Sequence, residues 1–114
     1  MKNPMKRGDI VLMADRTGGD FAGRPRPAVI VQRDSFQATD SVVVCPITSQ
    51  VTGMPLVRVA LSPGPATGLR LPSEVAVEKL TSVRRARISR AIGQVPERDM
   101  LILDRSIAVF LGIA

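Results

Sequence analysis

Cationic and hydroxyl side chains flank two apolar segments in the first half of the chain. Arg24 and Arg26 come just before the first segment, Ala28–Val31. The polar residues that follow the second segment, Val42–Val44, are Thr48, Ser49 and Gln50. If both segments are strands that pair antiparallel, the start of one lies beside the end of the other. Guanidinium groups and hydroxyls would then converge at one edge of a sheet, an arrangement that suits a phosphate.

The charge balance favours an anionic partner. The chain carries 16 basic and 10 acidic residues, for a formal net charge of +6, and 13 of the basic residues are Arg. Arginine recognises phosphate in a planar, bidentate manner, although basic domains are also common without any nucleic-acid role. Charge alone therefore makes nucleic acid only slightly favoured as the partner.

Composition also excludes several classes of site. The chain has no His and one Cys, so a His- or Cys-ligated metal site is excluded, and we expect neither a metal nor another cofactor. Cys45 lies in an apolar strand pattern typical of a buried, inert thiol. No apolar run is long enough to span a membrane, and the basic segment 1–7 is not followed by the apolar core of a signal peptide. We therefore expect a cytoplasmic protein.

The elements that would position these side chains are short strands and one helix. A chain of 114 residues is expected to form a single domain, residues 1–114. Strands are predicted at Asp9–Ala14 and Leu56–Leu61 in addition to the central pair, with one helical turn possible in the connection Gln32–Ser41. The segment 96–112 predicts a helix, because apolar residues recur on one face and acidic residues occupy its first turn. The fold predicted is a mainly β, small, curled antiparallel barrel of SH3-like type with a C-terminal helix packed on it.

The remaining segments predict loops and one further strand. Asp15–Pro25 is predicted to be a long loop, in which Phe21 either packs the loop down or stacks on a base. Ser62–Gly68 is rich in Pro and Gly and suits a mobile flap or an ordinary surface loop. Glu74–Leu80 alternates as a strand would, which directs Glu78 away from the core. The basic stretch 81–90 is typical of a solvated surface, and on a basic protein it can also follow a phosphate backbone.

Three motifs, in order, resemble the MazF/PemK family of toxin endoribonucleases. The first is Lys6-Arg7-Gly8-Asp9-Ile10-Val11, the second is Arg26-Pro27 followed by an apolar run and Gln32, and the third is Pro46-Ile47-Thr48-Ser49. The resemblance extends from about Lys6 to the C-terminus, and the ordered set is more specific than any single motif. It implies the same SH3-like fold.

The resemblance also implies roles for particular residues. It assigns catalysis to Arg26 and Thr48, and it matches Glu78 to a position where some members carry an acidic base. The Arg that those members carry two to three residues earlier is replaced here by Val75 or Ala76, and an ordinary solvent-facing strand residue is the alternative interpretation of Glu78. The residues expected to bind substrate are Phe21, Gly23, Arg24, Ser49, Gln50 and Arg84.

The function that follows is the toxin of a type II toxin–antitoxin system. The enzyme would be a sequence-specific, metal-independent endoribonuclease that cuts single-stranded mRNA by attack of the 2′-OH, leaving 2′,3′-cyclic phosphate and 5′-OH ends. The resemblance implies a homodimer and a cognate antitoxin, and an acidic, disordered antitoxin segment would suit a basic groove. The alternatives are a non-enzymatic toxin of the same fold that inhibits DNA gyrase and a plain SH3-like nucleic-acid-binding module.

Overall fold

A curled antiparallel sheet and one helix make up the fold in the computed structural model, which describes residues 5–14 and 24–114. The strands are β1 (Asp9–Met13), β2 (Arg26–Ile30), β3 (Ser41–Thr48), β4 (Arg58–Leu61), β5 (Ser73–Ala76), β6 (Thr81–Arg84) and β7 (Ile88–Gln94). Three single turns of 3₁₀ helix, η1 (Asp34–Phe36), η2 (Val77–Lys79) and η3 (Arg85–Arg87), and the helix α1 (Glu97–Phe110) complete the order. The expected mainly β fold with a C-terminal helix is confirmed.

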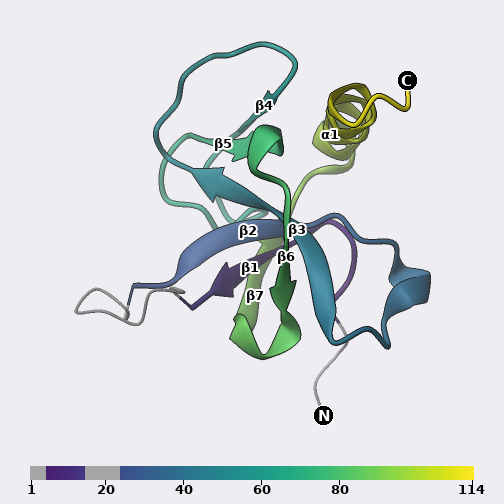
Figure 1. The fold of residues 1–114 in the computed structure, drawn as a ribbon. Coiled ribbons are helices and arrows are strands. Elements are labelled where there is room, and N and C mark those ends of the chain that lie inside the picture. The colour runs from purple at the N-terminus through teal and green to yellow at the C-terminus, as the bar shows by residue number, and fades with distance from the viewer. Residues whose placement is uncertain (1–4, 15–23) are drawn as a thin grey trace.

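Strand β3 is the centre of the sheet. Its one edge pairs with β2, while its other edge pairs first with β6 and then with β5. The path of neighbours runs β4-β5-β3-β2-β1-β7, with β6 off this path, and within the described residues it does not close into a barrel. In Figure 1 the sheet curls around its interior, and α1 lies across one side near β4.

The central strands are buried on both faces, which explains their continuous apolar sequence. Val29 and Cys45 belong to the cluster on which α1 packs through Leu103. Their neighbours Ala28 and Val44 belong to a second cluster, which the curl of the sheet encloses on the opposite face. Successive strand residues point to opposite faces, so where a strand passes between two cores both of its faces are apolar and the sequence does not alternate.

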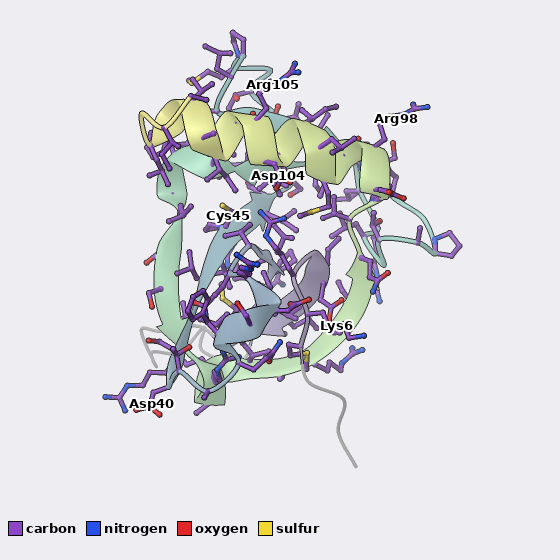
Figure 2. All side chains as sticks on the ribbon, turned by 90° about the vertical axis from the view of Figure 1, so that its right-hand side faces the viewer. Lys6, Asp40, Cys45, Arg98, Asp104 and Arg105 are labelled. Atoms are coloured by element: carbon purple, nitrogen blue, oxygen red, sulfur yellow. The ribbon has the colours of Figure 1, made fainter. Side chains whose placement is uncertain are left out.

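Helix α1 begins and ends within one or two residues of the predicted bounds, and part of the predicted apolar face is buried. Leu103 is fully buried, whereas Phe110 and Leu111 at the C-terminal end are exposed. Figure 2 shows Asp104 on the side of the helix that faces the sheet. Its Oδ1 accepts from Nη2 of Arg7 at 2.6 Å, so an ion pair ties the helix to the residues before β1.

The segment Ser62–Gly68, which follows β4, is not the mobile flap that was one of its two predicted alternatives. Thr67 is buried and its hydroxyl donates to the carbonyl of Ser62 at 2.9 Å, while the amide of Gln94 donates to the carbonyl of Ala66 at 2.9 Å. Gly68 has a φ of +73°, and a Cβ there would collide with the carbonyl of Ile92. The loop is therefore packed closely against β7, as an ordinary surface loop.

The strand predicted for Glu74–Leu80 is wrong beyond Ala76. All four residues of β5 are buried, and the chain then turns through η2 instead of continuing the ladder. The alternation of the sequence arises because both Val75 and Val77 enter the core, one from a strand and the other from a 3₁₀ turn. The basic stretch 81–90 forms β6, η3 and the start of β7, and its Arg84 and Arg90 are exposed, as expected for a solvated surface.

Candidate functional site

A cavity of about 590 Å³ opens where β2 begins and β3 ends. Its walls come from residues 24–27 and 46–50, from Leu69–Leu71, and from Ser73, Ala76 and Lys79. The cavity includes four of the residues predicted to act together, namely Arg24, Arg26, Thr48 and Ser49, and the fifth, Gln50, also lines it. The convergence that the antiparallel pairing predicted is therefore present.

The register of the central pair explains why Arg26 and Thr48 share this cavity. Ala28 lies opposite Pro46 and Ile30 lies opposite Val44 in the antiparallel ladder. Continuing the same register by two residues sets Arg26, the first residue of β2, opposite Thr48, the last residue of β3. A guanidinium and a hydroxyl thus extend from neighbouring backbone positions on a rigid sheet, which is the placement that a preorganised phosphate site requires.

The hydroxyl of Thr48 is oriented by the turn that follows it. Its Oγ1 accepts a hydrogen bond from the backbone N–H of Gln50 at 3.0 Å. A hydroxyl has one proton to donate besides its acceptor lone pairs. No acceptor within residues 5–14 and 24–114 takes that proton, so Thr48 can donate it to an oxygen in the cavity.

Two further cations, which the sequence analysis did not identify, line the cavity. Arg70 and Lys79 are both exposed, and both line it together with Arg24 and Arg26. Arg24, Arg26, Arg70 and Lys79 therefore all line the cavity, and no Asp or Glu is among its described lining residues. Arg70 lies after a Gly-containing loop and Lys79 in an unpredicted 3₁₀ turn, which is why spacing along the strands gave no sign of them.

The structure does not bring Glu78 to the cavity. Its carboxylate accepts from Nε of Arg58 at 3.0 Å and from Nη2 of the same guanidinium at 2.7 Å. This contact with Arg58 holds the pKa of Glu78 below its usual value. The carboxylate is ionised but committed to a buried cation, so its placement does not support the expected role as base.

The same arginine binds a second carboxylate, that of Glu74. Nη1 of Arg58 lies 3.1 Å from Oε1 of Glu74, and both side chains are almost fully buried. The backbone N–H groups of Thr52 and Gly53 also donate to Glu74, at 3.0 and 2.8 Å. The N–H of Thr52, then that of Gly53 and the guanidinium of Arg58, hold the pKa of Glu74 below its usual value. This network fixes the start of the loop between β3 and β4, which is the large arc in Figure 1.

Arg84, one of the predicted substrate-binding residues, does not line the cavity. Arg84 lies opposite Ser41 at the first residue of β3, whereas the cavity is at the last residue, Thr48. Seven residue steps of extended chain separate these positions by about 23 Å. Phe21 and Gly23 lie outside the residues that the structure describes.

Cys45 is a free thiol in the core. It is completely buried, and Figure 2 shows it in the interior between the sheet and the helix. Burial raises the pKa of this thiol to about 12. The thiol therefore stays protonated near neutral pH, in agreement with the predicted inert role.

The fold and the cavity together define a small, curled β protein in which four cationic residues line a cavity between two strand ends. Comparison with known proteins assigns the family. The chain belongs to the PemK-like, MazF-like toxins of type II toxin–antitoxin systems, whose family model matches residues 6–111. The family resemblance inferred from the three sequence motifs is thereby confirmed.

Individual relatives match over nearly their whole length. The probable endoribonuclease MazF of Mycolicibacterium smegmatis is 46% identical over 110 residues, covering 96% of this chain and 99% of the relative. Endoribonuclease MazF9 of Mycobacterium tuberculosis is 30% identical over 116 residues, covering 96% of this chain and 98% of the relative.

Solved structures share the fold at lower identity. A MazE–MazF crystal structure from Deinococcus radiodurans superposes with a TM-score of 0.79 at 21% identity, covering 99% of this chain and 100% of the other. An endoribonuclease from a mycobacterial species, solved with its cognate antitoxin, superposes with a TM-score of 0.76 at 19% identity, covering 96% of each chain.

Proposed function

We propose that this member of the MazF-like toxin family is an endoribonuclease that cuts single-stranded mRNA without a metal ion. The observation that supports it best is the cavity itself, which is lined by Thr48, by Arg26 and three further cations, and by no described carboxylate. A phosphodiester is the anion that such a site fits, and the names of the relatives at 46% and 30% identity give the reaction class.

The reaction proposed is transesterification within the RNA. The 2′-oxygen bonds to the adjacent phosphorus, the bond from phosphorus to the 5′-oxygen breaks, and the products carry a 2′,3′-cyclic phosphate and a 5′-OH. Arg26 stabilises the charge that develops on the phosphorane, since a guanidinium donates in a bidentate manner and keeps its proton. Thr48 donates its hydroxyl to an oxygen of the same phosphate.

The partners proposed are a second copy of the chain and a cognate antitoxin. An acidic antitoxin segment that folds on binding would compete with RNA for the cationic cavity. A homodimer agrees with the large apolar side chains exposed on and beside α1, among them Leu101, Phe110 and Ile113. None of the helices in the described residues is long and apolar enough to cross a membrane, and we place the activity in the cytoplasm, where mRNA is found.

The test is incubation of the purified chain with end-labelled RNA in EDTA. We expect discrete fragments whose new 5′ ends accept phosphate from polynucleotide kinase without prior phosphatase treatment. Binding without cleavage would favour the plain nucleic-acid-binding module, and inhibition of DNA supercoiling without RNA cleavage would favour the gyrase inhibitor.

A further inference from the structure

The 3₁₀ turn η2 directs its three side chains in three different directions. A 3₁₀ helix has three residues per turn, so consecutive side chains are about 120° apart. Val77 is fully buried in the core, Glu78 is bound to Arg58, and Lys79 is exposed at the cavity. With its two neighbours anchored elsewhere, the third residue of the turn, Lys79, is the one that lines the site.

The ion pair of Glu78 makes this orientation rigid. Three N–H···O contacts of 2.7 to 3.0 Å join Glu78 to a guanidinium whose side chain is 9% exposed. That guanidinium, of Arg58, is in turn held by the buried Glu74. The turn therefore supplies a cation to the cavity lining, at the place where the family resemblance had implied a carboxylate.

Lys79 differs chemically from the other cations of the cavity. The remaining three are arginines, which retain their protons under all ordinary conditions. An ammonium group releases a proton far more readily than a guanidinium and is nevertheless charged near neutral pH. Of the four cations, Lys79 is thus the one suited both to attract a phosphate and to protonate a leaving oxygen. The chain has only three lysines, and this one lines the cavity.

We propose that Lys79 is the general acid of the cleavage reaction, an inference that rests on the proposed ribonuclease function. As the 2′-oxygen bonds to phosphorus and the bond to the 5′-oxygen breaks, the ammonium of Lys79 transfers a proton to that 5′-oxygen. The proton of the 2′-OH leaves to solvent, and solvent reprotonates the amine, so protons balance over one turnover. Arg26 and Thr48 stabilise the phosphorane and take no part in this transfer.

The test compares two RNA substrates that differ only in the leaving atom. One is an oligoribonucleotide with the ordinary 5′-oxygen at the mapped cleavage site, and the other has sulfur in that bridging position. A thiolate leaves without being protonated, because thiols are much more acidic than alcohols. An enzyme that has lost its general acid should therefore regain its rate on the sulfur substrate.

We expect Lys79→Met to slow single-turnover cleavage of the oxygen substrate by ~10²-fold or more, the usual contribution of a general acid. The same variant should cut the sulfur substrate at about the wild-type rate. Lys79→Arg keeps the charge but holds its proton, so it should bind RNA like the wild type and still cut the oxygen substrate slowly. Arg70→Gln is the matched control, since loss of a cation that only binds phosphate should slow both substrates equally.

Three results would overturn the assignment while leaving the proposed function intact. They are equal slowing of both substrates by Lys79→Met, full activity of Lys79→Arg, and full activity of Lys79→Met on the oxygen substrate. If the wild-type chain cuts neither substrate, the proposed function itself is wrong and the role of Lys79 is refuted with it. Because Lys79 is exposed, we expect Lys79→Met and Lys79→Arg to keep the wild-type melting temperature, which calorimetry checks.

Discussion

Replacing Thr48 by Val removes one hydroxyl from the cavity and almost nothing else. Valine has nearly the same shape as threonine and suits the end of a strand, so the backbone of β3 should be kept. The hydroxyl has two functions, and losing each of them should slow cleavage by a different factor. It accepts the N–H of Gln50 at 3.0 Å, and it is proposed to donate to the scissile phosphate.

The two functions predict different losses of rate. An intramolecular hydrogen bond contributes roughly 1 kcal/mol, and Thr48 is only partly buried, so loosening the Gln50 turn alone should cost at most about fivefold. Loss of a donor to the charge that develops in the transition state costs ~10²–10³ in kcat, or about 2.7–4 kcal/mol. A fall of a hundredfold is therefore too large for the turn and requires donation to the phosphate.

The assay is single-turnover cleavage at saturating protein, combined with the affinity for an uncleavable 2′-deoxy analogue of the substrate. We expect kcat to fall ~10²–10³-fold while affinity changes little, because the cations supply most of the binding. Thr48→Ser, which keeps the oxygen, should recover most of the rate. If Thr48→Val loses affinity but not kcat, or loses only a few-fold of either, then Thr48 is a binding or turn residue and catalysis takes place elsewhere.

Three further predictions follow from the cavity and from the buried ion pairs. Arg26→Ala should abolish cleavage without changing the melting temperature. The control is Arg105→Ala, on the outer side of the helix in Figure 2, which should change neither the cleavage rate nor the melting temperature. Wild-type cleavage rates in Arg26→Ala would refute the catalytic role of Arg26. Arg24→Ala should weaken RNA binding and reduce the slope of log affinity against log salt by ~0.7, the value for one phosphate contact of a single strand, and an unchanged slope would mean that Arg24 contacts no phosphate. The lowered pKa of Glu74 means that its stabilisation is present above the ordinary carboxyl value of 4.5 and is lost as the pH falls below it. Thermal scans from about pH 7 to pH 3 should therefore show a smaller loss of stability in Glu74→Gln than in the wild type. The variant should already be less stable at pH 7, because Arg58 loses a buried partner. Identical pH profiles of the two proteins would contradict this prediction.

The central strand pair and its polar ends could be predicted from sequence, because local patterns and antiparallel geometry suffice. The apolar runs locate β2 and β3, and antiparallel pairing alone brings Arg26 to Thr48. The C-terminal helix could be predicted equally well, since the spacing of its apolar residues and its acidic first turn are local signals. The limits of the strands were less accurate, and β3 continues through Thr48 where the apolar pattern suggested an end near Val44.

The far wall of the cavity could not be predicted in this way. Lys79 reaches the site only because the chain leaves the ladder after Ala76, and that turn depends on tertiary packing of Val77 and on the pair between Glu78 and Arg58. One signal was present in the sequence. Arg58 lies within an apolar strand, and a charge buried there requires a carboxylate partner, which would have directed Glu78 inward and not into the site.

The most direct test of the account is cleavage of an RNA that carries a single 2′-deoxynucleotide on the 5′ side of the mapped scissile phosphate. The wild-type protein in EDTA should cut the all-ribose strand to a 2′,3′-cyclic phosphate end and should leave the singly substituted strand intact, while binding both about equally. Cleavage of the deoxy-substituted strand at the same bond would show that the 2′-OH is not the nucleophile and would contradict the mechanism built on Arg26, Thr48 and Lys79.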